Sequence, residues 1–168
     1  TLSASSAASD VYKRQAAARA GVALDPPGRL VKVGDGGMHL DCEGAGSPTV
    51  LLEAGNMAYS GAWRWLQGSL SASTRVCSYD RRGLGWSEDI GTPRDGRTIA
   101  AELHQLLTEA GETGPLVLVG HSLGAPYVRS FAQAYPDRTT ALMLIDPSHP
   151  RQFELWPEDL GNPKAGIR

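Results

Sequence analysis

A serine between two glycines is the residue of this sequence best suited to chemistry. Ser122 lies at the centre of a G-x-S-x-G motif that begins at Gly120 and ends at Gly124. An apolar run precedes the motif and a helix-competent run follows it directly, so the pattern predicts a sharp strand-to-helix turn in which side chains at the glycine positions would clash. Such a turn leaves the serine hydroxyl exposed at the edge of a sheet. We therefore expect Ser122 to be a nucleophile; the alternative is a structural glycine-rich turn that contains a serine.

The groups around Ser122 must also suit a nucleophile. The helix predicted after it would direct a positive N-terminal end and unpaired N–H groups toward the same place, where an oxyanion could be stabilised. A serine also needs a general base within hydrogen-bonding reach. Only His149 follows Ser122 in the sequence, and we expect it in a surface loop. The side chain of His121 should point away from that of Ser122, and His39 and His104 are expected to be structural or solvated.

Four stretches of the sequence together resemble the serine α/β-hydrolase family, of the esterase and lipase kind. Residues 120–129 resemble its nucleophile elbow, and residues 49–56 its third strand and oxyanion loop. Residues 79–87 resemble the tight loop after the fourth strand, and residues 141–149 the sixth strand and its exit. The resemblance covers about residues 29–149. It implies an α/β fold, with a mostly parallel sheet and helices on both faces, truncated after about the sixth strand.

The resemblance also implies a mechanism. Ser122 would attack the carbonyl carbon of an ester, amide or thioester to form an acyl-enzyme, and the backbone N–H groups of Leu123 and Asn56 would hold the oxyanion. Many relatives have His-Gly where this chain has Ala54-Gly55, a change that keeps the backbone donor. A serine at the nucleophile position argues against the members of the family that open epoxides or remove halides with an aspartate. The expected partner is a small-molecule, ester-like substrate whose identity the sequence leaves open.

The remaining catalytic groups are expected elsewhere. The family carries its base after the eighth strand and its acid usually after the seventh, so both should lie beyond residue 168, and the 168-residue chain alone should be inactive. Asp146 is a candidate acid because it follows a predicted strand; its alternative role is to cap the turn. We expect Asp80 and Arg81 to be structural, with the aspartate accepting N–H groups of the following loop and the arginine paired locally. The alternative function is that of a non-catalytic truncated fragment or a binding relative of the fold.

Apolar runs and helical periodicity place the elements that must position these residues. Strands are predicted at 29–33, 38–43, 49–53, 75–79, 116–120 and 140–145, and helices at 63–70, 98–110 and 123–135. Three regions follow: a disordered or non-native tail at 1–28, the N-terminal part of an α/β-hydrolase core at 29–149, and the start of a cap or linker at 150–168, with the fold incomplete. The alternation of strands and helices indicates a mostly parallel sheet.

Composition excludes several classes of protein. The chain has 168 residues, which suggests one domain, and its net charge of −2 with no basic cluster argues against nucleic-acid binding. No apolar run is long enough for a membrane span, so a soluble protein is expected. The first residue is not Met, so an upstream signal or anchor stays open and the localisation is unknown. No metal-ligand spacing or P-loop occurs, and Gly83-Leu84-Gly85 lacks the rest of a dinucleotide site. No cofactor or metal is therefore expected, and the oligomeric state stays open.

Cys42 and Cys77 are the only cysteines, and each lies in a predicted strand. We expect them to be small buried hydrophobic side chains. A disulfide between them is the alternative, because two cysteines do not make a disulfide framework and do not settle the redox compartment.

Overall fold

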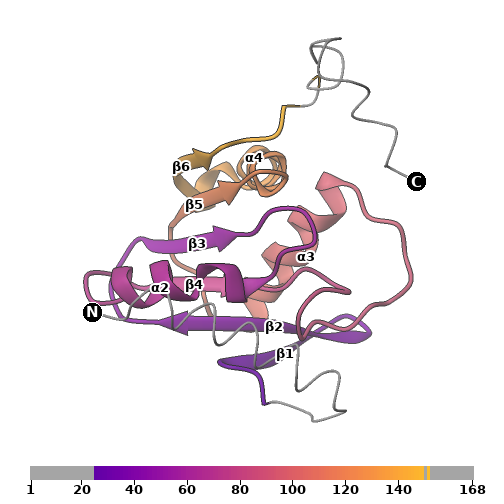
Figure 1. Cartoon of the computed structure of the whole chain (residues 1–168), viewed down its shortest axis with the longest axis horizontal. Helices are drawn as coiled ribbons and strands as arrows, with labels where there is room; N and C mark the ends of the chain where they lie inside the picture. Colours follow the sequence, from indigo (N-terminus) through magenta and orange to yellow (C-terminus); the bar gives the residue numbers. More distant parts are fainter. Residues whose placement is uncertain (1–24, 150, 152–168) are drawn as a thin grey trace.

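A computed structural model of the chain describes residues 25–149 and 151 (Figure 1). Its six strands form one sheet in the order β1-β2-β4-β3-β5-β6. The pairs β1·β2 and β2·β4 are antiparallel, whereas the pairs β4·β3, β3·β5 and β5·β6 are parallel. The strands are β1 (Arg29–Val33), β2 (Gly36–Glu43), β3 (Thr49–Glu53), β4 (Val76–Tyr79), β5 (Leu116–His121) and β6 (Thr139–Ile145). The predicted α/β fold with a mostly parallel sheet is confirmed.

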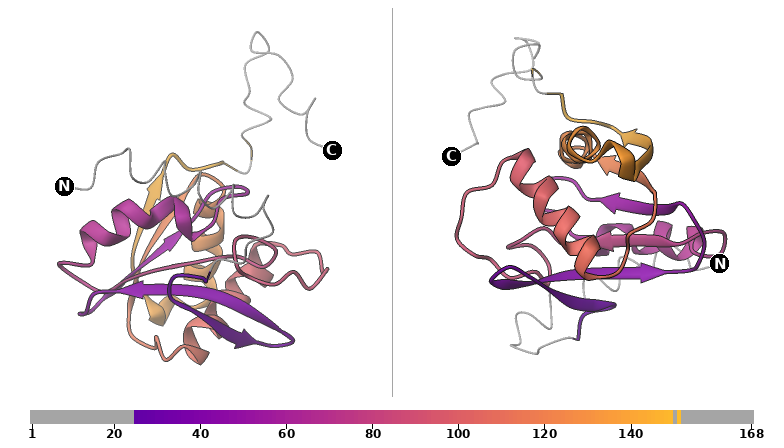
Figure 2. Two further views of the ribbon diagram at one scale, coloured as in Figure 1. Left: turned by 60° about the horizontal axis from the view of Figure 1, so that its bottom comes forward. Right: turned by 180° about the vertical axis from the view of Figure 1, so that it is seen from behind.

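Helices cover both faces of this sheet (Figure 2). They are η1 (Ser60–Trp63), α2 (Arg64–Leu70), α3 (Gly96–Glu109), α4 (Gly124–Ala134) and η2 (Pro136–Arg138), where η marks a 3-10 helix. Helices α3 and α4 lie on one face, and their apolar side chains close the larger core with those of β1, β2 and β5. Helix α2 and η1 lie on the other face, where Trp63 packs on Leu52, Val76 and Val119. Each predicted helix is present, with ends shifted by one or two residues.

Two ends that differ from the prediction, the start of α3 and the start of β2, have a plain physical cause. The sequence predicts that the second helix starts at residue 98, but α3 starts at Gly96. The Asp95 side chain caps it there by accepting hydrogen bonds from the N–H groups of Arg97 at 3.1 Å and Thr98 at 2.9 Å. The strand predicted from residue 38 begins at Gly36, because Val33 pairs directly with Gly36. The loop of the hairpin is therefore only two residues long, and Gly34 adopts a φ of 54° in it.

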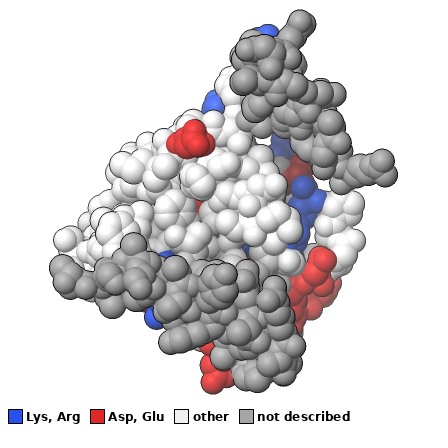
Figure 3. Space-filling model, viewed as in Figure 1, with Lys and Arg blue, Asp and Glu red and all other residues white. Residues whose placement is uncertain are grey.

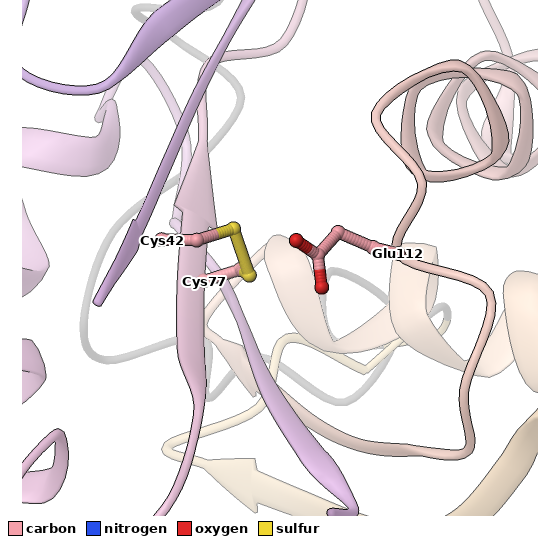
Figure 4. Close-up of side chains that lie close together, drawn as sticks. All are labelled: Cys42, Cys77 and Glu112. Carbon is pink, nitrogen blue, oxygen red and sulfur yellow. A yellow bond between two sulfur atoms is a disulfide. The ribbon is translucent and has the colours of Figure 1, made fainter. Parts of the chain in front are cut away.

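The two cysteines correct the expectation of separate thiols. Cys42 and Cys77 form a disulfide that links β2 to β4. They face each other directly in the antiparallel register, with a Cα–Cα distance of 4.1 Å, so strand pairing alone brings their side chains together. Figure 4 shows the Glu112 carboxylate beside them, and this carboxylate pairs with the Arg75 guanidinium. A disulfide and a paired carboxylate leave no ligand set for a metal at this place.

The outer strand β6 differs from the rest of the sheet. Its apolar side chains are exposed on both faces, and Met143 is 57% exposed. Within the part of the chain that the structure describes, β6 has no neighbour on its outer edge. Among the same residues, no helix is both long and apolar enough to cross a membrane. The tail predicted at 1–28 and the cap or linker predicted at 150–168 lie almost entirely outside the described residues and stay predictions.

Candidate functional site

Ser122 occupies the turn between β5 and α4, as its motif predicts. Its φ is +50°, in the left-handed region that residues other than glycine seldom adopt. Hydrogen bonds hold this strained turn in place. The Ser122 N–H donates to the Ile145 carbonyl at 3.0 Å, and the Ser122 carbonyl accepts from the N–H groups of Ala125 at 3.1 Å and Ser148 at 3.0 Å. The turn is therefore anchored both to α4 and to the chain that leaves β6.

The flanking glycines are required by close packing, which confirms the predicted clash. A Cβ on Gly120 would lie 2.7 Å from a Val128 methyl carbon and 2.8 Å from the Cα of Ala125. A Cβ on Gly124 would lie 2.7 Å from each of the carbonyl oxygens of Glu53 and Ala54. The first glycine lets α4 approach β5, and the second lets α4 rest on the end of β3. Because Gly120 and Gly124 have no side chains, the serine can lie next to the loop after β3.

That loop, residues 54–56, packs directly against the serine. A Cβ on Gly55 would lie 3.3 Å from the Ser122 Cβ and 3.1 Å from Nδ1 of His121. Neither of the two proposed oxyanion donors, the backbone N–H groups of Asn56 and Leu123, donates to another group within residues 25–149 and 151. Asn56 is exposed. Neither N–H group is therefore used by the described part of the chain, and their role as an oxyanion hole stays a prediction.

A buried charged cluster supports the same loop. The Arg81 guanidinium donates through Nη1 to a Glu53 carboxylate oxygen and to the Ala54 carbonyl at 2.6 Å, and through Nη2 to the Gly55 carbonyl at 2.6 Å. The Tyr79 hydroxyl donates to the other carboxylate oxygen of Glu53. All three of these side chains are buried. The expectation that Arg81 pairs locally is wrong, because its partners lie 26 to 28 residues earlier in the chain. They are at the end of the neighbouring parallel strand β3 and in the loop that follows it.

Burial shifts the pKa values of Glu53 and Tyr79. It raises the pKa of Glu53 above its usual 4.5, and the Arg81 guanidinium and the Tyr79 hydroxyl oppose that rise. Burial, followed by the neighbouring Glu53 carboxylate, raises the pKa of Tyr79 well above 10, so the phenol keeps its proton and remains a donor. Each oxygen of Glu53 faces a donor, which is the arrangement that an ionised carboxylate accepts best.

A second buried pair organises the loop after β4. Asp80 accepts from the N–H groups of Ser60 at 2.7 Å and Trp86 at 2.9 Å, and its Oδ2 lies 3.0 Å from Nδ1 of His39. The predicted structural role of Asp80 as acceptor for the following loop is confirmed. A Cβ on Gly85 would lie 2.1 Å from Oδ2 of Asp80, so this glycine is needed for the loop to close over the carboxylate.

The pKa values of this pair favour its charged form. Burial would lower the pKa of His39, but hydrogen bonds to Asp80 and to the Pro27 carbonyl outweigh it and raise that pKa above 6.5. Burial would raise the pKa of Asp80, but hydrogen bonds from His39 and from the N–H groups of Trp86 and Ser60 lower it below 3.8. The sequence predicts that His39 is either structural or solvated. It is fully buried, which agrees with a structural role.

The four histidines of the chain differ in their surroundings. Among the described residues, no histidine side chain is hydrogen-bonded to Ser122. His121 is exposed and lies edge-on to Trp63, His104 stacks on Tyr135 with ring centroids 4.0 Å apart, and His149 accepts from the N–H of Arg151 at 3.1 Å.

Asp146 lies at the end of β6 with a φ of 42°, directly after the residue whose carbonyl accepts from Ser122. Its exposed carboxylate makes no hydrogen bond within residues 25–149 and 151, so the alternative role of capping its turn is not seen there. Its role as a catalytic acid stays a prediction.

A hollow of about 280 Å³ borders the serine turn. Its walls are mostly apolar and are formed by Ala54, Gly55, Ala62, Trp63, His121 and Ile145. The uncovered part of the molecular face in Figure 3 is largely uncharged, and its charged groups lie near the margins. An apolar hollow next to the serine turn suits an uncharged organic group better than a highly charged one.

Known proteins are similar to this chain in sequence and in fold. An uncharacterized protein of Schizosaccharomyces pombe is 31% identical over 154 residues, covering 74% of this chain and 29% of that protein. The pyrrolizixenacetamide deacetylase of Xenorhabdus hominickii is 29% identical over 144 residues, covering 82% of this chain and 54% of the deacetylase. A thermophilic esterase from Thermogutta terrifontis superposes with a TM-score of 0.65 at 27% identity, covering 76% of this chain and 49% of the esterase.

The extent of these matches and a family model define the relation of this chain to known proteins. The chain spans only about a third to a half of the length of the proteins that it matches. Residues 48–166 match the family model described as the alpha/beta hydrolase fold, and the strand order, the strained serine turn and the helix behind it agree with that match. The chain belongs to the α/β-hydrolase family.

Proposed function

We propose that the full-length protein hydrolyses an ester, amide or thioester bond, with Ser122 as nucleophile and an acyl-enzyme as intermediate. The observation that carries this proposal is the strained backbone of Ser122, whose φ of +50° is held by hydrogen bonds from two separate segments. Strain of this kind persists only where the surrounding structure enforces it, and it is concentrated at functional sites. Glycine adopts a positive φ without strain. A serine at this position therefore needs a reason other than the turn itself, and a chemical role supplies one.

The proposed reaction proceeds in two steps. The Ser122 hydroxyl oxygen attacks the carbonyl carbon while a general base removes its proton, and the N–H groups of Leu123 and Asn56 stabilise the resulting oxyanion. Collapse of this intermediate expels the alcohol, amine or thiol, which takes up the proton, and water then releases the acid by the same route. We assign the general base to the part of the full-length protein outside the described residues, and Asp146 remains our candidate for the acid.

The related proteins support an acyl group as the target. One is named a deacetylase and one an esterase, and both names describe removal of an acyl group. The hollow beside Ser122 has apolar walls, which agrees with an uncharged substrate. We therefore propose uncharged small-molecule esters and amides as the substrate class, in preference to an anionic one.

Two variants of the full-length protein test this proposal. Hydrolysis of p-nitrophenyl acetate and of longer p-nitrophenyl esters is measured for the wild type, for Ser122→Ala and for Ser69→Ala, a control on the exposed side of α2. We expect Ser122→Ala to lower kcat/KM by roughly 10⁴-fold or more, as loss of a serine nucleophile does, and Ser69→Ala to leave it unchanged. Full activity in Ser122→Ala would refute the proposal, and a wild type without measurable turnover of esters or amides would favour the non-catalytic binding relative.

A further inference from the structure

We propose that Arg81 is a positioning residue for the oxyanion hole: it fixes the peptide plane that aims the N–H of Asn56. This inference rests on the proposed function, because it assigns a role within the same site. It concerns a residue that touches no reacting atom and acts through the backbone of the loop after β3.

The guanidinium binds two successive carbonyls of that loop. Its Nη1 donates to the Ala54 carbonyl and its Nη2 to the Gly55 carbonyl, both at 2.6 Å. Arg81 is 8% exposed, so water competes little for these hydrogen bonds, and bonds from a charged donor are about twice as strong as neutral ones. The planar fork of the guanidinium matches two acceptors at once, which a lysine cannot do.

Peptide geometry converts this contact into a direction for the N–H of Asn56. The carbonyl of Gly55 and the N–H of Asn56 belong to one planar unit, and in the usual trans form they point in opposite directions. Since the Gly55 carbonyl points at Arg81, the Asn56 N–H must point away from Arg81. A rotation of this peptide would remove the N–H from its direction and break a buried, charge-assisted hydrogen bond. Gly55 has no side chain that could oppose such a rotation. Within the loop its carbonyl also accepts from the N–H of Ala58 at 3.3 Å, and Arg81 adds the shorter, charge-assisted hydrogen bond at 2.6 Å from outside the loop.

The surroundings of Arg81 hold the guanidinium itself in place. Its charge is balanced by Glu53, whose second oxygen accepts from the Tyr79 hydroxyl. Its Cζ lies 5.3 Å from the ring centroid of Tyr127, a residue of α4, at a distance where a cation is attracted to an aromatic face. Because α4 also follows Ser122 directly, one guanidinium touches both the loop after β3 and the helix behind the serine.

Lysine in place of arginine tests the inference in the full-length protein. Arg81→Lys keeps the charge and loses the fork, so we expect kcat and kcat/KM for a p-nitrophenyl ester to fall together by roughly 10²- to 10³-fold with KM within about threefold, as for the loss of one oxyanion donor. The matched control is Arg75→Lys, which also removes an arginine bound to a glutamate, Glu112, and to a backbone carbonyl, that of Gly44. Arg75 precedes β4, at the other end of the strand, so its loss should lower stability and leave kcat unchanged.

Labelling with a fluorophosphonate to completion counts the sites with a reactive serine, so that kcat is expressed per folded site. If Arg81→Lys does not fold, Arg81→Ala in the presence of added guanidinium chloride at 10 to 50 mM provides the second test, with NaCl as the control. We expect guanidinium to raise kcat above that in NaCl. An unchanged kcat per labelled site in Arg81→Lys, or no rescue of a folded Arg81→Ala, would overturn the inference.

The two proposals fail in different ways. Activity that survives Ser122→Ala refutes the proposed function whatever Arg81→Lys does. If Ser122→Ala is inactive and Arg81→Lys keeps the wild-type kcat per labelled site, the proposed function stands and only the role of Arg81 is refuted.

Discussion

Replacing Gly124 by alanine places a methyl group between α4 and the end of β3. Its carbon would lie 2.7 Å from the carbonyl oxygens of both Glu53 and Ala54 and 2.9 Å from the Glu53 Cγ. Relief requires a shift of about half an ångström, and two of the three neighbours are backbone atoms that cannot rotate away. The Ala54 carbonyl also accepts from Arg81, so a shift of this carbonyl strains a buried hydrogen bond as well.

The expected cost follows from these contacts. Overpacking a well-packed site costs typically about 1–3 kcal/mol, and the fixed backbone on one side favours the upper part of that range. For chains of roughly 150–250 residues each kcal/mol lowers Tm by about 2–4 °C, so we expect Gly124→Ala to lower Tm by about 5–10 °C. Thermal unfolding of the full-length protein followed by circular dichroism measures this directly.

Gly68→Ala is the matched control. Gly68 lies in α2, and a Cβ there would meet nothing within 4 Å. Alanine favours a helix by about 1 kcal/mol over glycine, so this variant should be slightly more stable than the wild type. If Gly124→Ala unfolds at the wild-type Tm, or if both variants lose the same stability, the reasoning about the serine turn is refuted.

Two further predictions concern the buried pair and the disulfide. Because the pKa of His39 is raised, its contribution to stability is complete below about pH 6.5 and is lost as the pH rises through the folded pKa. Because the pKa of Asp80 is lowered, its contribution to stability is complete above about pH 4 and is lost as the pH falls through the folded pKa. Chemical denaturation should therefore show the largest loss for His39→Gln between about pH 5 and 6 and a smaller one at pH 9; a loss that does not vary with pH would contradict this. Mass spectrometry without reductant should find Cys42 linked to Cys77, and reduction should lower stability by about 4 kcal/mol, the chain-entropy value for a separation of 35 residues; free thiols in the folded, air-oxidised protein would contradict the disulfide.

Local patterns predicted most of the fold. Continuous apolar runs such as residues 50–52 and 116–119 identify parallel strands because such strands are buried on both faces. The apolar stripe of residues 99, 103, 106, 107 and 110 predicts the buried face of the helix. Ile99, Leu103, Leu106 and Leu107 are buried, and Ala110, the C-cap of α3, is half-buried. The turn at Ser122 could be predicted from its local motif, because the contacts that require Gly120 come from Ala125 and Val128, which follow in the same segment. The contacts that require Gly124 come from Glu53 and Ala54, far earlier in the chain.

The contacts that the sequence did not predict join distant residues. The disulfide depends on the register between β2 and β4, and a shift of one residue would turn one sulfur to the opposite face of the sheet. The contact between Arg81 and Glu53 depends on β3 and β4 being neighbours in the sheet, with both residues at the same end. A carboxylate at the end of one predicted parallel strand and an arginine just after the next was the available signal, because parallel strands end at a common edge.

The measurement that tests the central claim most directly is covalent trapping at Ser122. The full-length protein is mixed with an activated ester, quenched in acid within milliseconds to seconds, digested and analysed by mass spectrometry, with Ser122→Ala treated in parallel. We expect the mass of the acyl group on the peptide that contains Ser122, its formation and decay at rates that account for kcat, and no adduct on that peptide in Ser122→Ala. Turnover of the ester without an adduct at Ser122, or with an adduct on another side chain that forms and decays at the catalytic rate, would contradict the account.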